Sequence, residues 1–228
     1  MILTIRPEPG CSATVDAGHA VGLAIEGQPL FEVRPLAWQA PPAETIDALL
    51  LGSANAVRHG GPALQALRDK PVHAVGKATA EAAEVAGFTV ASTGRGDLQA
   101  LVDTLAGPLR LMRLTGAEHM PLAAPAGIEV ETRIAYESVP LPLPDNLAES
   151  LRDSALVLLH SASAARHFAA ECDRCDVPRG AIALAALAAR IADAAGEGWR
   201  EVRSAAAPSE AALLALARDM CHYPGSGR

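Results

Sequence analysis

The chain has 228 residues, half of them hydrophobic, and its 26 Asp and Glu outnumber its 19 Lys and Arg, giving a formal net charge of -7. This length suits one large or two small domains with a buried core. The acidic balance and an aromatic content of 3% argue against nucleic acid as a partner, because nucleic-acid binders present basic faces and aromatic platforms.

Membrane segments are not expected. No apolar run reaches the roughly 18 residues that suggest a membrane span, and the first ten residues lack a basic stretch followed by an apolar one. We therefore expect a cytoplasmic protein with no membrane partner.

As far as residue 139, apolar runs of strand length alternate with helical segments. Ser53 and Asp97 are natural N-caps for two of these helices, and Gly87 is placed to close a third. We predict extended segments at 1–5, 29–38, 47–51, 71–75, 88–91, 109–114 and 128–139. We predict helices at 11–22, from Ser53 with a restart at 60–62, at 79–86, at 97–106, and as a short proline-bounded piece before residue 128.

The same alternation continues to the end of the chain. We predict strands at 155–159, 181–184 and 199–202. Helices are expected near residue 151, from Ser161, up to residue 195, and from Ser209 onward. Strands that alternate with helices require parallel sheets.

Two parts of the chain repeat one pattern. Residues 47–57 read DALLLGSANAV and residues 154–165 read SALVLLHSASAA, each an apolar run followed by a Ser where a helix would begin. Aligning the two parts pairs Ser53 with Ser161, Asn55 with Ser163, and His59 with His167. The correspondence extends downstream, where residues 75–87 align with 184–196. It indicates a duplicated structural unit.

The fold class predicted from this repeat is α/β, with two similar doubly wound, flavodoxin-like parallel-sheet lobes joined by a two-stranded connector. Two extended, proline-flanked segments bound the first copy and so form the connector, at 35–37 and 133–137. The strand at 1–5 is left over from the first copy and completes the sheet of the second. The domain boundaries are 1–34 plus 138–221 for lobe one, 38–132 for lobe two, and a disordered tail at 222–228.

Ligands of such sheets bind at the carboxyl ends of the strands. The residues expected at those ends are mostly neutral donors: Arg6, Ser53, Asn55, Gly76, Lys77, Thr79, Arg113, Ser161 and Ser163. No glycine-rich dinucleotide fingerprint, phosphate loop, zinc-protease motif or nucleophile elbow is present. Backbone N–H groups and hydroxyls at helix starts can hold carboxylates or phosphates, and we expect no cofactor and no metal.

Cysteine usage supports the absence of a metal site. Four Cys in a chain of this length form no disulfide framework. Cys172 and Cys175 are spaced C-x-x-C, but no second pair or histidine lies at ligand spacing. We interpret the pair as a helix end with two incidental thiols.

The whole chain to about residue 221 resembles the uroporphyrinogen-III synthase family. The resemblance rests on the order and spacing of TIRP at 4–7, DALLLGSANAV at 47–57, VGKATAEA at 75–82, RIAYES at 133–138 and ALVLLHSASAARHF at 155–168. It implies two α/β lobes with a two-stranded connector. It also implies a cofactor-free cyclising lyase of tetrapyrrole biosynthesis that acts on hydroxymethylbilane, closing the ring with inversion of its fourth pyrrole, ring D, and loss of water.

The resemblance assigns roles to particular residues. The position that matches the family's proton donor is Tyr136, whose phenol would assist departure of the hydroxyl. The donors at the strand ends would hold the eight substrate carboxylates, with Arg6, Lys77 and Arg113 supplementing them, while closure of the lobes folds the linear tetrapyrrole. A monomer is expected, with transient contact to the preceding pathway enzyme as a further hypothesis.

Each residue also has a plainer interpretation. Ser53, Ser161 and Thr79 would serve only as caps, Tyr136 as a strand aromatic, and Arg6 as the partner of an acidic neighbour. His59 and His167 are expected on the surface. The family usually keeps Gly and Thr or Ser where this chain has Ala185 and Ala188, so contacts from that turn should be made by backbone alone or be absent.

Two rival functions remain open at this point. One is a non-enzymatic two-lobed binding module for a small anionic metabolite, which would use the same donors but would not need Tyr136. The other is a phosphosugar-handling α/β enzyme, which would call for a phosphate loop or catalytic carboxylates that the sequence lacks.

Overall fold

The computed structural model describes residues 1–222 and divides the chain into two units. Unit 1 comprises Met1–Glu32 together with the chain from Val139 onward, and unit 2 is Val33–Ser138. The chain crosses between the units inside β3 (Phe31–Pro35) and β8 (Ile128–Pro140). The predicted tail at 222–228 lies outside the described residues except for His222, which ends a helix.

Unit 1 contains a five-stranded sheet in the order β11-β10-β9-β1-β2, with all neighbours parallel. Its strands are β1 (Ile2–Thr4), β2 (Ile25–Gly27), β9 (Ala155–Leu159), β10 (Ile182–Ala186) and β11 (Glu201–Ser204). The N-terminal strand β1 therefore completes the sheet of the second repeat copy, as predicted. The short strand β2 at the sheet edge was not predicted.

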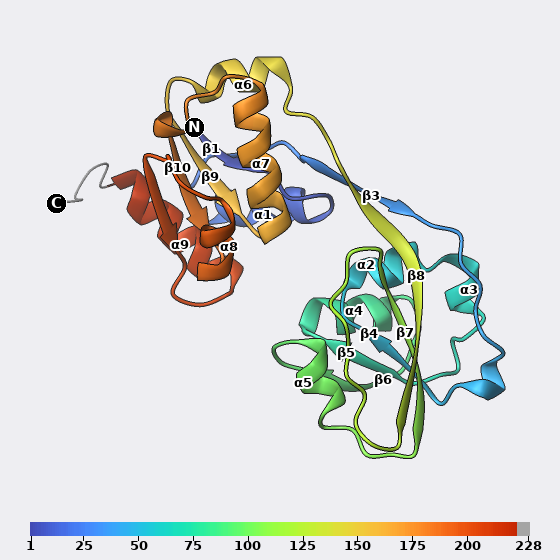
Figure 1. Cartoon of the computed structure of the whole chain (residues 1–228). Coiled ribbons are helices and arrows are strands. Elements are labelled where there is room, and N and C mark those ends of the chain that lie inside the picture. Colours follow the sequence, from blue (N-terminus) through green and yellow to red (C-terminus); the bar gives the residue numbers. More distant parts are fainter. Residues whose placement is uncertain (223–228) are drawn as a thin grey trace. The chain divides into compact units, whose positions relative to one another are not determined.

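Helices cover both faces of this sheet (Figure 1). Successive strand side chains point to opposite faces, so Val157 and Leu159 pack in one core cluster while Leu156 and Leu158 pack in another. On the first face lie α6 (Asp145–Leu151), α7 (Ala162–Arg174) and α8 (Ala189–Ala194); on the second lie α1 (Gly10–Ala20) and α9 (Glu210–His222). Burial on both faces explains the continuous apolar runs of the sequence.

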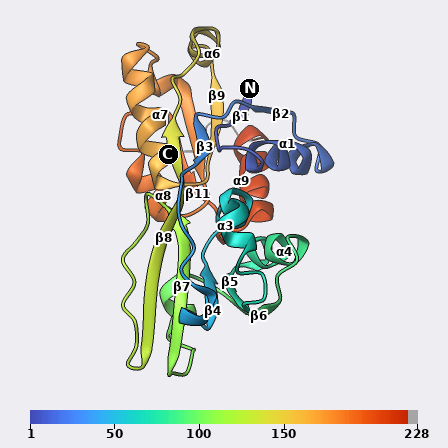
Figure 2. The same ribbon diagram turned by 90° about the vertical axis from the view of Figure 1, so that its right-hand side faces the viewer.

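Unit 2 contains a six-stranded sheet in the order β3-β8-β7-β4-β5-β6, in which β8 runs beside β7 over most of its length (Figure 2). The pairs β4–β5, β4–β7, β5–β6 and β7–β8 are parallel. Its other strands are β4 (Ala48–Leu51), β5 (Val72–Val75), β6 (Val90–Gly94) and β7 (Leu109–Gly116). One face packs against α2 (Ala54–His59), α3 (Gly61–Gln65) and α4 (Lys77–Val85), and the other against α5 (Leu98–Val102).

The two sheets share one spatial plan. Strands β9, β10 and β11 correspond to β4, β5 and β6, and the remaining strands β1 and β2 correspond to β7 and β8. Each sheet has two adjacent central strands whose following connections lead to opposite edges of the sheet. These strands are β1 and β9 in unit 1, and β4 and β7 in unit 2. The position outside the carboxyl ends of such a pair is the switch point, where open α/β sheets bind ligands.

One predicted helix is wrong. Residues 117–127 contain no helix, although they connect two parallel strands as a helix usually does. Pro121 and Pro125 disfavour helical backbone, and the segment is tied instead to Gln99, whose side chain donates to the Ala123 carbonyl at 2.7 Å and accepts from the Ala123 N–H at 2.9 Å. Leu122 packs beside α5 in place of a helix face.

Within residues 1–222, no helix combines the length and apolar character needed to cross a bilayer.

Candidate functional site

The repeated serines cap helices at the carboxyl ends of the central strands, as predicted. Ser53 follows β4, and its hydroxyl accepts a hydrogen bond from the Asn55 N–H at 3.2 Å. Ser161 follows β9, and its hydroxyl accepts from the Ala164 N–H at 3.1 Å. Asn55 and Ser163 are half-buried in the first turns of these helices. Both hydroxyls keep their own O–H as a donor.

The turn after β5 depends on a glycine. Gly76 has a φ of +77°, a conformation that L side chains rarely adopt, and it precedes the first turn of α4. Thr79 is buried in that turn, and its N–H donates to the Gly76 carbonyl at 3.2 Å. Lys77 lies in the open, with 89% of its side chain exposed and Glu81 at 3.3 Å.

The equivalent turn of unit 1 lacks side-chain donors. Ala188 is the N-cap of α8 and forms no side-chain cap bond, while its carbonyl accepts from the Ile191 and Ala192 N–H groups. Ala185 is fully buried in β10. This turn therefore offers backbone groups only.

Arg113 is a buried cation without a counter-ion. It lies in β7 with 7% of its surface exposed. One guanidinium nitrogen, Nη1, donates to the Met120 carbonyl at 3.0 Å, and the buried Nε has no partner. No described carboxylate is within ion-pair distance of it. Burial lowers the pKa of Arg113 from its ordinary value, and Tyr136 partly opposes this shift. A buried, unpaired charge costs several kcal/mol, so the position favours an anionic ligand.

Tyr136 is half-buried on β8, opposite Gly116 at the carboxyl end of β7. A Cβ at Gly116 would lie 2.6 Å from the Tyr136 Cε2, so the phenol ring occupies space that any other residue would fill. The His59 ring is 6.0 Å away, centre to centre, and tilted by 39°. Glycine and imidazole thus define the position of the ring.

The two repeated histidines are not on the open surface, contrary to expectation. Both are half-buried. His59 ends α2 beside Tyr136, and burial together with the charge of Arg58 lowers its pKa. His167 is hydrogen-bonded through Nε2 to the Leu141 carbonyl at 2.8 Å and meets the Phe31 ring edge-on. Each lies against a segment where the chain passes between units, a contact that helix periodicity does not reveal.

Arg6 has the acidic neighbour that the plainer interpretation required. Its Nη1 is 3.3 Å from the Glu210 Oε2 and also donates to the Thr14 hydroxyl at 3.3 Å. Glu210 further accepts from Thr14 at 2.7 Å and lies 3.1 Å from the Nε2 of His160. Neither His160 nor Glu210 was predicted from the sequence, because neither belongs to a recognisable motif.

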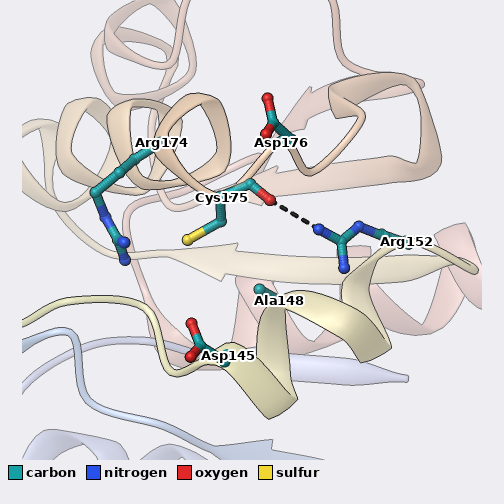
Figure 3. A pocket seen from close by; sticks show the side chains of 6 residues that line it. All are labelled: Asp145, Ala148, Arg152, Arg174, Cys175 and Asp176. Carbon is teal, nitrogen blue, oxygen red and sulfur yellow. Dashed lines mark hydrogen bonds between the residues drawn. The ribbon is translucent and has the colours of Figure 1, made fainter.

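A separate cavity of about 300 Å³ lies in unit 1, lined by Asp145, Ala148, Arg152, Arg174, Cys175 and Asp176 (Figure 3). Helix α7 begins at the carboxyl end of β9 and runs back toward the amino end. Its last turn and this cavity therefore lie near the amino ends of the strands, away from Ser161. Arg152 donates to the Cys175 carbonyl at 2.8 Å. Burial raises the pKa of the neighbouring Cys172 to about 12, and residues 1–222 contain no group of side chains suited to a metal ion.

The family model described as "Uroporphyrinogen-III synthase HemD" matches residues 19–215. The chain belongs to the uroporphyrinogen-III synthase family. This family consists of cyclising lyases of tetrapyrrole biosynthesis. None of the curated proteins compared with the chain matches it.

Solved structures of the same family share the fold. The chain is similar to uroporphyrinogen-III synthetase from Helicobacter pylori, with a TM-score of 0.65 and 18% identity over 96% of this chain and 98% of that one. It is also similar to a mutant uroporphyrinogen III synthase from Thermus thermophilus, with a TM-score of 0.54 and 18% identity over 98% of this chain and 100% of that one. At these identities the likeness shows the fold, and the roles of side chains must be argued from this chain.

Proposed function

We propose that this member of the uroporphyrinogen-III synthase family cyclises hydroxymethylbilane to uroporphyrinogen III, with inversion of ring D and loss of water. The observation that carries the proposal beyond family membership is Arg113, a buried guanidinium in the central strand β7 whose one hydrogen-bond partner is a neutral backbone carbonyl. A substrate rich in carboxylates supplies the missing counter-ion.

The fold supports a finer description. Each unit is one flavodoxin-like lobe, because the strand order of unit 1 is the 2-1-3-4-5 order of that fold and the sheet of unit 2 has the same spatial plan. The two-stranded connector consists of the neighbouring strands β3 and β8 with the residues that flank them. There the Leu36 N–H donates to the Ala135 carbonyl at 2.8 Å and the Leu141 N–H to the Leu30 carbonyl at 2.9 Å.

Substrate carboxylates are held by short-range donors. The protein is itself acidic, and salt screens charges beyond about 8 Å at physiological ionic strength. A charge-assisted hydrogen bond contributes about 1.5 to 3 kcal/mol, so a few donors suffice. In unit 2 we assign this role to Ser53, Asn55, Gly76, Lys77, Thr79 and Arg113, and in unit 1 to Ser161 and Ser163.

Tyr136 assists departure of the hydroxyl group. Its phenol donates a proton to the leaving oxygen as the carbon–oxygen bond breaks, so that water departs. The substituted carbon of ring D bonds to the methylene that lost the hydroxyl, which gives a spiro intermediate. The older bond from that carbon to its bridging methylene then breaks, and this methylene bonds to the unsubstituted carbon of ring D. That carbon releases its proton when aromaticity returns, and this proton restores the phenol. General acid catalysis of this kind increases the rate roughly a hundredfold or more. The bound conformation of the linear tetrapyrrole decides which ring carbon reacts.

The test is an assay of the purified protein with hydroxymethylbilane that separates the uroporphyrinogen isomers. We expect the inverted type III isomer, and Tyr136→Phe should lower kcat about ten- to a hundredfold while the unfolding temperature changes little. Wild-type protein that binds the bilane but leaves the isomer ratio of the uncatalysed reaction unchanged is a binding module, and the proposed function is then wrong. An unchanged kcat in Tyr136→Phe would remove only the role of Tyr136.

A further inference from the structure

The switch points of the two units carry different charges. In unit 2 the position outside β4 holds the neutral donors Ser53 and Asn55, and the unpaired Arg113 lies within the neighbouring strand β7. In unit 1 the position outside β1 and β9 holds Arg6, which follows β1, and His160, which follows β9. The switch point of unit 1 differs from that of unit 2 because it also contains a carboxylate, that of Glu210, the first residue of α9.

Glu210 extends into the switch point of unit 1, where its carboxylate contacts the side chains of Thr14, His160 and Arg6. Thr14 of α1 is fully buried and donates to Oε1 at 2.7 Å. His160, whose side chain is 8% exposed, lies 3.1 Å from Oε2, and Arg6 lies 3.3 Å from the same oxygen. A hydroxyl, an imidazole and a guanidinium around two carboxylate oxygens form an anion-binding arrangement.

Packing fixes Arg6 in this arrangement. A Cβ at Gly10 would lie 2.5 Å from the Arg6 Nε and 2.9 Å from its Nη2, so the guanidinium lies against the bare backbone at the start of α1. Burial alone would raise the pKa of Glu210, but the hydrogen bonds from His160 and Thr14 and the charge of Arg6 outweigh it and lower that pKa. The carboxylate therefore remains ionised at neutral pH.

We propose that Glu210 is an internal anion that occupies the carboxylate site of unit 1. Arg6 is then already neutralised within the protein and contributes little to substrate binding, which revises the role predicted for it from sequence. The second half of the inference rests on the proposed function: the buried cation that holds substrate carboxylates is Arg113 of unit 2. The bare turn at Ala188 agrees with this unequal division, because it adds no side-chain donor to unit 1.

The first experiment measures anion binding without any assay of activity. Glutarate is titrated by calorimetry into full-length protein carrying Arg113→Gln, which removes the buried, unpaired cation of unit 2, and into the same protein with Glu210→Ala added. We expect the added substitution to tighten glutarate binding at least tenfold, because it removes the carboxylate and leaves room for another one beside Arg6, His160 and Thr14. Further addition of Arg6→Gln should abolish that gain. If Glu210→Ala produces no gain, Glu210 only fastens α9 to the sheet and the proposal is overturned.

The second experiment compares kinetics and does not require a variant at position 210 to fold. Arg113→Gln should raise the KM for hydroxymethylbilane at least fivefold more than Arg6→Gln does. An equal or larger effect of Arg6→Gln would show that Arg6 binds substrate, and it would overturn the proposal while leaving the proposed function intact. A wild-type protein without synthase activity would refute the proposed function, and the glutarate titration would still decide the role of Glu210.

Discussion

At the scale of single residues, we expect Arg113 to destabilise the folded protein but to strengthen the binding of substrate carboxylates. Its guanidinium is buried with a single backbone acceptor, so replacement by an apolar side chain of similar length removes an unpaired charge from the interior. Met120 is exposed, and its carbonyl can then bond to water. Residues at binding sites often oppose stability in this way.

We therefore expect Arg113→Met to raise the free energy of unfolding by about 1 kcal/mol or more and to raise KM at least tenfold. Urea denaturation and steady-state kinetics check the two effects. The matched control is Arg110→Met on the same strand, which breaks an exposed ion pair with Asp47 and should increase neither quantity. Destabilisation by Arg113→Met would show that the guanidinium is structural.

At the scale of elements, the caps Ser53 and Ser161 have two separable properties. As N-caps they stabilise α2 and α7 by accepting backbone hydrogen bonds. As ligands they would donate their hydroxyl protons to carboxylates. Aspartate caps a helix about as well as serine but repels a carboxylate, so it separates capping from binding.

Ser53→Ala should lower stability by about 1 kcal/mol and raise KM. Ser53→Asp should restore the stability yet raise KM further than Ala does. Denaturation midpoints and kinetics on the same preparations provide the readout, with Asp97→Ser at the cap of α5 as a control that should leave KM unchanged. If Ser53→Asp has the KM of wild type, the residue is only a cap.

The elements also show which local rules were sufficient. Serine before a helix, Gly87 with a φ of +86° after α4, and the continuous apolar runs of the central strands are local signals, and each is confirmed. The segment 117–127 was predicted wrongly because Gln99, which holds it, precedes it by about twenty residues. Propensity alone could not reveal a backbone fastened by a distant side chain.

At the scale of the whole molecule, the two units should respond differently to acid. Burial lowers the pKa of His59 and of His73, both in unit 2. A histidine whose pKa is lower in the folded state loses its stabilising effect as pH falls below the unfolded value near 6.5. In unit 1 the shifted acids are Glu171, whose pKa Arg174 lowers, and Glu210, and their contribution is lost only below about 4.5.

The two tryptophans allow each unit to be followed separately, since Trp38 lies in unit 2 and Trp199 in unit 1. Between pH 7.5 and 5.5 we expect the urea midpoint reported by Trp38, in Trp199→Phe protein, to fall, while the midpoint reported by Trp199, in Trp38→Phe protein, stays nearly constant. Near pH 3 both should fall; Asp47, with its pKa lowered to about 2 by hydrogen bonds from Arg110, adds to the loss in unit 2. Equal responses above pH 5.5 would contradict the assignment to His59 and His73.

The sequence by itself determined the repeat, the parallel α/β class, the helix caps and the leftover N-terminal strand, because these depend on residues within one element or on the comparison of two copies. Only the tertiary structure decided that Arg6 is paired while Arg113 is not, and that Gly116 and His59 enclose Tyr136. Glu210 lies 204 residues from Arg6 along the chain. Whether a charge is neutralised depends on atoms within a few ångströms, and the fold alone determines which distant residues come that close.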